Sequence, residues 1–106
     1  MTTVQILQQA RKLLAKRGGW IQGRFRDRTG PGGGYCVVGA IHQASGWDIV
    51  KGERCIGCLI RALRGPNQFP TTCFHLTFYN DHKGRKKSDI LKLYDKAIVA
   101  AKRASR

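Results

Sequence analysis

Apolar residues recur at helical spacing near the start of the chain. This spacing predicts a first helix from about Val4 to Arg17 with one apolar face. Thr2 and Gln5 have the separation of a capping box, which predicts the start of this helix. The pair Gly18-Gly19 predicts its end. The apolar face is made by Ile6, Leu7, Ala10, Leu13 and Leu14.

Three further segments show helical patterns. The segment from Tyr35 to Ser45 is apolar on nearly every side, which predicts a central, buried helix. A third helix is predicted between Asp48 and Leu63, strongest over Arg54–Leu63, with a stop at Gly65-Pro66. Ser88 is the predicted cap of a last helix over roughly Asp89–Ala101, because apolar positions recur there every three or four residues.

The connecting segments are less regular. Residues 23–34 read GRFRDRTGPGGG, which predicts a loop without regular structure, and residues 80–87 read NDHKGRKK, which predicts a turn. Around residues 69–80, Phe74, Leu76 and Phe78 alternate with polar residues as in a strand. The spacing of the two phenylalanines, together with Pro70, also allows a short helix. We therefore expect a mainly α, compact four-helix single domain over residues 1–106, with a short strand or hairpin allowed around residues 69–80.

The net charge of the chain indicates which classes of partner it could bind. Twenty Lys and Arg face six Asp and Glu, a formal net charge of +14. The excess is present in both halves of the chain, so the charge belongs to the folded domain and not to a tail. Such a field attracts nucleic acid, anionic membranes or acidic proteins, although solubility alone remains an alternative. No apolar run approaches the ~20 residues of a membrane helix. The first residues also lack the apolar block of a secretory signal, so we expect a cytoplasmic protein with no membrane partner.

Two clusters of cations occur in the predicted loops. Exposed Arg and Lys near aromatic residues are typical of phosphate contacts with some base stacking, although two solvated loops would look the same. We predict a protein that binds DNA or RNA with little sequence specificity. If six to eight side chains met phosphates, affinity would fall with salt at a log–log slope of about −5 to −7. An alternative is a module that binds an acidic host protein, because the same charges would steer that association. The predicted nucleic-acid-binding residues are Arg24, Arg26, Arg28, Lys83, Arg85, Lys86 and Lys87.

Cysteine and histidine chemistry gives weaker patterns. Cys55 and Cys58, with Cys73 and His75, are the residue types of a zinc site. The first pair falls at helical spacing on an apolar face, and a single residue separates the second pair. We therefore predict no metal or cofactor and leave the zinc alternative open. Cys36 with His42, or Cys73 with His75, would serve as nucleophile and base, but no triad or acid–base pair is assembled, so we predict no enzyme activity.

Two other features remain open. The run Gly30-Pro31-Gly32-Gly33-Gly34 precedes a helix start, where backbone N–H groups hold phosphates in some proteins. It matches neither common nucleotide-binding motif, so a plain connector is favoured. Trp47 follows Gly46 and precedes Asp48, which predicts partial exposure and suits an anchor for a protein interface.

Three segments together resemble a known family. They are Gly19-Trp20-Ile21-Gln22-Gly23 after the first helix, Tyr35-Cys36-Val37-Val38-Gly39-Ala40-Ile41, where the Gly-rich loop enters the second helix, and Tyr79-Asn80-Asp81 before the last helix. In this order they are similar to a family of small actinobacterial and actinophage proteins described as a domain of unknown function. That family usually has Trp where this chain has Tyr79, and its members are less basic. The resemblance implies a small, largely helical intracellular domain and supplies no activity.

Overall fold

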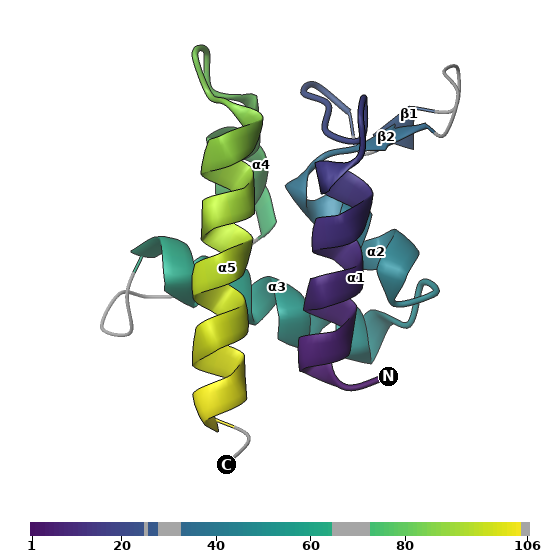
Figure 1. The fold of residues 1–106 in the computed structure, drawn as a ribbon, viewed down its shortest axis with the longest axis vertical. Coiled ribbons are helices and arrows are strands. Elements are labelled where there is room, and N and C mark those ends of the chain that lie inside the picture. Colours follow the sequence, from purple (N-terminus) through teal and green to yellow (C-terminus); the bar gives the residue numbers. More distant parts are fainter. Residues whose placement is uncertain (25, 28–32, 65–72, 105–106) are drawn as a thin grey trace.

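The described residues form five α-helices and one pair of very short strands (Figure 1). The structure, a computed structural model, describes residues 1–24, 26–27, 33–64 and 73–104. For residues 26–27, 64 and 73–75 it describes the backbone alone. The elements are α1 (Thr3–Ala15), β1 (Arg26–Asp27), β2 (Gly34–Tyr35), α2 (Val37–Ala44), α3 (Ile49–Arg64), α4 (Cys73–Asp81) and α5 (Lys87–Ala104). The mainly helical, compact single domain is confirmed, with one helix more than the sequence predicted.

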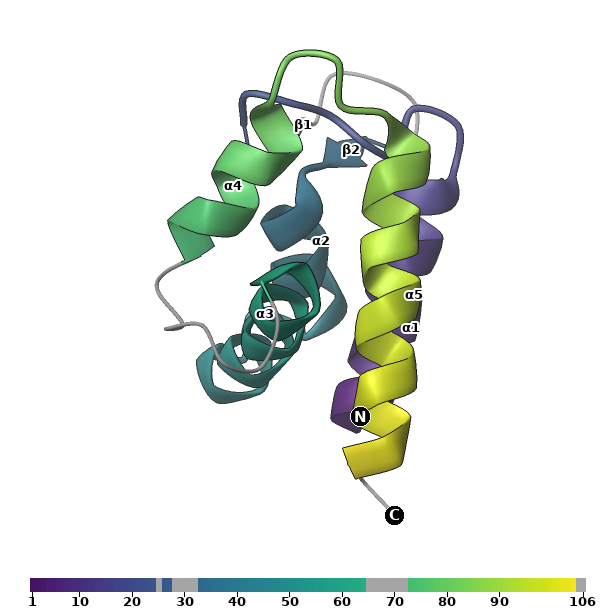
Figure 2. The same ribbon diagram turned by 90° about the vertical axis from the view of Figure 1, so that its left-hand side faces the viewer.

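The helices form two layers. Helices α1 and α5 run side by side in opposite directions, and α2, α3 and α4 lie on the other side of the core (Figures 1 and 2). The residues from Val37 to Ile41 on α2 are all buried, which confirms the predicted central helix. Within the described ranges, no helix has both the length and the apolar character needed to cross a bilayer.

The helix starts follow from local hydrogen bonds. The predicted capping box of α1 is present: the Gln5 N–H donates to Thr2 Oγ1 at 3.1 Å, and the Thr2 N–H donates to Gln5 Oε1 at 2.9 Å. Cys36 caps α2, where its Sγ accepts the Gly39 N–H at 3.3 Å. The predicted cap Ser88 is wrong, because α5 already begins at Lys87. Its start is fixed instead by Asp89, whose carboxylate accepts the Lys86 N–H at 2.9 Å.

The chain after α1 packs directly against the start of α2. The Gly19 carbonyl accepts the Tyr35 N–H at 2.8 Å, and the Tyr35 carbonyl accepts the Ile21 N–H at 3.1 Å. A Cβ at Gly19 would lie 2.1 Å from the Leu13 carbonyl oxygen, so only glycine fits this close approach. The predicted loop over residues 23–34 is also corrected, because it contains β1 and the first residue of β2. These two strands pair antiparallel, with Arg26 opposite Tyr35. Its Gly30-Pro31-Gly32 part lies outside the described residues.

The strand alternative around residues 69–80 is wrong for the part that the structure describes. Residues 73–81 form α4, and residues 69–72, with Pro70, lie outside the described ranges. The alternation with Phe78 was misleading, since Phe78 is 72% exposed while Leu76 and Asn80 are fully buried. Leu76, Tyr79 and Asn80 face inward at the spacing of a helix. The predicted turn from Asn80 is therefore shorter, because α4 continues to Asp81.

Candidate nucleic-acid interface

Asn80 is the best-satisfied polar side chain of the interior. It is fully buried at the end of α4, and its amide makes four hydrogen bonds, the full number that an asparagine side chain offers. Its Oδ1 accepts Trp20 Nε1–H at 2.7 Å and the Val37 N–H at 2.9 Å. Its Nδ2 donates to the Ile21 carbonyl at 3.0 Å and to Asp81 Oδ1 at 2.9 Å. This Asn80 network joins three segments that are far apart in sequence.

The same region connects two loops. Gln22 Nε2 donates to the Asn80 carbonyl at 2.9 Å and to the His82 carbonyl at 3.1 Å. The Gly23 N–H donates to the Asp81 carboxylate at 2.9 Å. The loop after α1 and the turn after α4 are thus held side by side. The sequence analysis placed Asn80 and Asp81 only at the start of a turn, although both belong to the quoted segments, which meet here in space.

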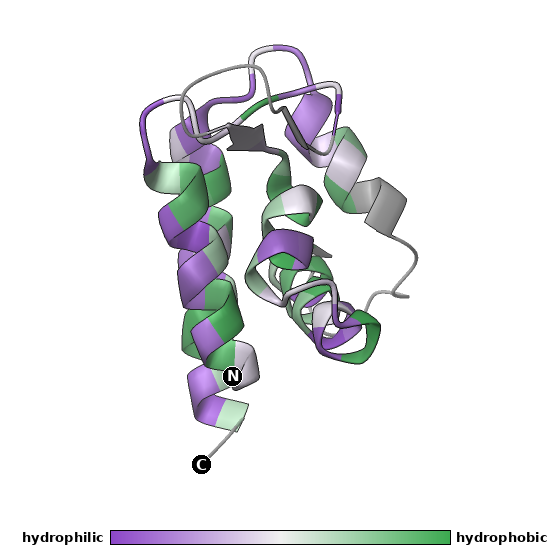
Figure 3. Ribbon diagram, turned by 90° about the vertical axis from the view of Figure 1, so that its right-hand side faces the viewer, coloured by the Kyte–Doolittle hydropathy of each residue, from purple (hydrophilic) through white to green (hydrophobic). Residues whose placement is uncertain are grey.

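Seven cations gather at this end of the molecule. The loop after α1 and the turn before α5 both lie at the top of Figure 1, and Figure 3 shows that the connections there are mainly hydrophilic. Five of the seven predicted residues have described side chains at this end, and three of these are exposed: Arg24, Lys83 and Lys86. Lys16 and Arg17, at the end of α1, are exposed beside them and were not predicted. We call this surface the basic end: Lys16, Arg17, Arg24, Lys83, Arg85, Lys86 and Lys87.

Two members of the basic end also hold the fold together. Arg85 Nε donates to the Tyr79 carbonyl at 2.8 Å, and the guanidinium carbon lies 3.7 Å from the centre of the Tyr79 ring. Lys87 Nζ donates to the carbonyls of Ala15 and Lys16 at 2.8 and 2.6 Å. A lysine ammonium at the carbonyl end of a helix satisfies its unpaired acceptors and complements its dipole. Arg85 and Lys87 therefore have structural partners, unlike a purely solvated charge cluster.

The remaining predicted arginines are only partly described. Arg26 is placed by its backbone in β1, and Arg28 lies outside the described residues. Among the side chains that the structure describes, the carboxylates of Asp81 and Asp89 are close to the basic end, and both accept backbone N–H groups. Asp81 accepts the Gly23 N–H and Asp89 accepts the Lys86 N–H. The basic end thus keeps a surplus of positive charge at its surface.

The described cysteine thiols are held in the neutral form. Burial raises the pKa of the Cys36 thiol, and the Gly39 N–H opposes this only in part. Burial raises the pKa of the Cys55 thiol to about 12, and Cys55 Sγ lies 3.8 Å from the Thr3 carbonyl. A nucleophile or a metal ligand needs a thiolate. Cys36 and His42 also point to other partners, since the His42 ring stacks on Trp47 with ring centres 5.0 Å apart.

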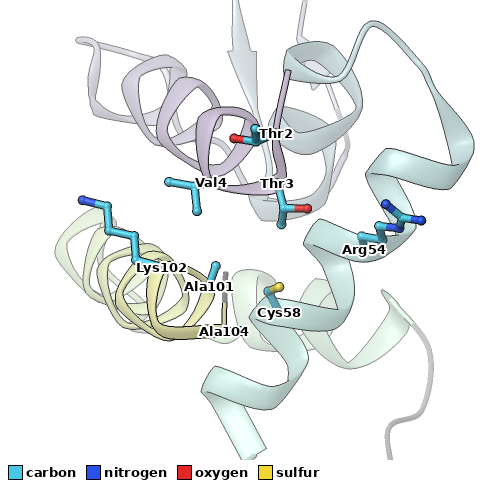
Figure 4. A pocket seen from close by; sticks show the side chains of 8 residues that line it. All are labelled: Thr2, Thr3, Val4, Arg54, Cys58, Ala101, Lys102 and Ala104. Atoms are coloured by element: carbon cyan, nitrogen blue, oxygen red, sulfur yellow. The ribbon is translucent and has the colours of Figure 1, made fainter. Parts of the chain in front are cut away.

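The structure describes the side chains of only two of the four residues in the alternative zinc site. Cys55 and Cys58 both lie on α3, whereas the side chains of Cys73 and His75 lie outside the described residues. Among the described side chains, no group of three or more metal-ligating residues comes together. Cys58 lines a pocket between the start of α1, the middle of α3 and the end of α5 (Figure 4). Burial raises the pKa of its thiol as well, although Arg61 opposes the shift, so the pocket presents a neutral thiol beside apolar Val4 and Ala101.

An exposed apolar tip lies at the turn between α2 and α3. Trp47 is 58% exposed, which agrees with the sequence prediction, and Ile49 and Val50 are more exposed still. Trp47 also has a φ of 64°, a left-handed conformation that costs a non-glycine residue about 1–2 kcal/mol. We call Trp47, Ile49 and Val50 the Trp47 tip. It lies on a different part of the surface from the basic end.

Fold and surface together define a small, mainly helical domain with one cationic end. The chain belongs to a family of unknown function, DUF6197, whose model matches residues 1–100. The expectation of a family without assigned activity is therefore confirmed. No curated protein and no solved structure matches the chain.

Proposed function

We propose that this protein binds nucleic acid through the phosphate backbone, with little sequence specificity. The observation that supports the proposal is the basic end, where seven cations come from the loop after α1, the turn before α5 and the first residue of α5. The bonds of Gln22, Gly23 and Lys87 hold these segments side by side. Cations fixed on a folded surface bind a polyanion by displacing its condensed counterions. In this proposal the protein is an accessory factor of phage or actinobacterial origin that acts in the cytoplasm of the host cell.

Salt dependence tests this proposal directly. If most of the basic end contacts phosphates, the log of the association constant should fall against the log of the salt concentration with a slope of about −4 or steeper. Fluorescence anisotropy with labelled DNA and RNA, from about 50 to 200 mM salt, measures this slope. Unrelated sequences should bind within about threefold of one another, because phosphate contacts carry no sequence information. Absence of binding to every nucleic acid at the lowest salt would contradict the proposal.

The Trp47 tip supports a second candidate, a module that binds an acidic host protein. Three exposed apolar side chains lie within four residues of the chain, and the Trp47 ring is held at the surface by stacking on His42. Tryptophan is enriched among the residues that dominate binding energy at protein interfaces, and the net charge would steer an acidic partner toward it.

Capture from nuclease-treated host lysate distinguishes this candidate from the first. A protein partner that depends on the tip should survive the nuclease and should bind the Trp47→Ala variant at least about 30-fold more weakly. The matched control is Phe78→Ala, which removes another exposed aromatic ring, on α4. Equal loss in both variants, or equal retention in both, would exclude the Trp47 tip as the binding surface. Because Trp47 is exposed, its replacement should change the free energy of unfolding by less than about 1 kcal/mol.

A further inference from the structure

A second group of cations forms a straight row along α5. Lys92, Lys96 and Arg103 are all exposed. At 100° per residue they fall within about 40° of one another around the helix axis, and they span about 17 Å along it. We call these three residues the α5 row. They point away from the buried side of α5, which carries Ile90, Tyr94 and Ala97.

The two carboxylates of α5, Asp89 and Asp95, each have a partner outside the α5 row. Asp95 takes a bidentate pair from Arg11 of α1, with Nε at 2.7 Å and Nη2 at 3.1 Å. Asp89 accepts the Lys86 N–H at the start of the helix. Helix α1, which lies alongside, contains no acidic residue and adds exposed Lys12. Like charges four residues apart cost an isolated helix about 0.2–0.5 kcal/mol, so the repulsion between Lys92 and Lys96 gives no benefit to the free protein.

The α5 row continues the basic end along the same helix. Lys86 stands just before α5 and Arg103 near its last residue, whereas Lys87 is turned toward the end of α1, away from the α5 row. From Lys86 to Arg103 the distance along the axis is about 26 Å, at about 1.5 Å per residue. This length matches about eight base pairs of B-DNA, which rises about 3.4 Å per pair. A shallow hollow on the same surface is lined by Lys96, Val99 and Arg103, and also by Asp95.

We propose that the ligand is a double-stranded nucleic acid lying along α5, in contact with both the basic end and the α5 row. This inference rests on the proposed function and names the form of its ligand. A duplex is a stiff rod with phosphates at regular intervals, which suits cations in line on a stiff helix. Proteins that hold single strands instead offer aromatic rings on which bases stack. Helix α1 has no aromatic residue, and the one aromatic residue of α5, Tyr94, is fully buried and donates its hydroxyl to the Val37 carbonyl at 2.6 Å.

Binding to duplexes of increasing length tests this inference. The wild-type protein should bind a duplex of about 12 base pairs at least tenfold more tightly than one of about 6, because only the longer duplex reaches Arg103. Replacing the α5 row with glutamine (Lys92→Gln, Lys96→Gln and Arg103→Gln) should remove this gain. It should also make the salt slope for the longer duplex shallower by about 2 to 3, close to 0.9 per lost phosphate contact. The anisotropy of labelled duplexes gives both quantities.

A matched control removes the same charge from another surface. Lys51, Arg54 and Arg61 are exposed on α3, and their joint replacement with glutamine should leave the length dependence unchanged. The inference is overturned if the α5 row variant binds the longer duplex like the wild type. It is also overturned if a single strand binds more tightly than the duplex and Phe78→Ala weakens that binding. Both of these results would leave the proposed nucleic-acid binding intact. A wild-type protein that binds no nucleic acid would contradict the proposed function instead.

Discussion

Replacing Asn80 with alanine is expected to cost the folded state about 3–5 kcal/mol. The variant leaves the Val37 N–H, the Trp20 indole N–H and the Ile21 carbonyl without their partner in the interior. Each buried polar group left unpaired costs about 1–3 kcal/mol, and relaxation of the site recovers part of the total. A small domain has about 5–15 kcal/mol of stability in all, so this one residue should decide whether the fold persists at 37 °C. Urea unfolding followed by circular dichroism measures the loss.

Asn80→Asp is the control that separates hydrogen bonding from packing. It keeps the size of the side chain and the oxygen that accepts the Trp20 indole N–H. It also places a carboxylate at a buried position, next in sequence to the exposed carboxylate of Asp81. Burial and the neighbouring charge should raise the pKa of this new carboxyl above its value in the unfolded chain. The folded variant therefore binds a proton more tightly than the unfolded chain, and its deficit relative to wild type should shrink as the pH falls from 7 to 5. A deficit that is constant with pH would contradict the burial of this position.

Removing three cations from the basic end is expected to weaken nucleic-acid binding on the order of 100- to 1,000-fold at about 50 mM salt. The variant is Arg24→Gln with Lys83→Gln and Lys86→Gln, which are three exposed cations of the basic end. The salt slope should become shallower by about 2 to 3, because each lost phosphate contact contributes about 0.9. Anisotropy titrations at several salt concentrations measure both effects.

The fold of this variant should be unaffected, since substitutions at exposed positions usually change stability by less than about 0.5 kcal/mol. Its control is again the glutamine variant of Lys51, Arg54 and Arg61, which loses the same net charge from α3. If both variants lost affinity equally, binding would depend on the net charge of the molecule and not on the basic end. That result would contradict the proposed function in its present form.

The helices were predictable because their signals are local. The capping box at Thr2 and the apolar positions from Ile6 to Leu14 specify α1 within a few residues, and the density of apolar residues after Tyr35 predicted the burial of α2. Likewise, Gly46 beside Trp47 was enough to predict an exposed ring, because the short turn leaves the side chain no core to enter. In each case the deciding interaction lies within one or two turns of chain.

The errors have a common physical origin in contacts between distant segments. The side chain of Asn80 looked like that of a turn residue, since asparagine often bonds to its own backbone. Its actual partners are 43 to 60 residues away, apart from Asp81. Ser88 is a good cap by type, yet α5 begins at Lys87, two residues before the predicted start, where Asp89 accepts the Lys86 N–H. The predicted site omitted Lys16 and Arg17 because the sequence does not show that the end of α1 meets the turn before α5.

Binding of a phosphate by the Lys87 ammonium has a free-energy cost that a count of positive charges does not include. It occupies the last carbonyls of α1, so a phosphate that draws it away must leave those oxygens to water and loosen the final turn of that helix. Fewer of the seven cations can therefore neutralise a ligand than a charge map suggests. A polyanion and the last carbonyls of α1 therefore compete for the same atom, Lys87 Nζ.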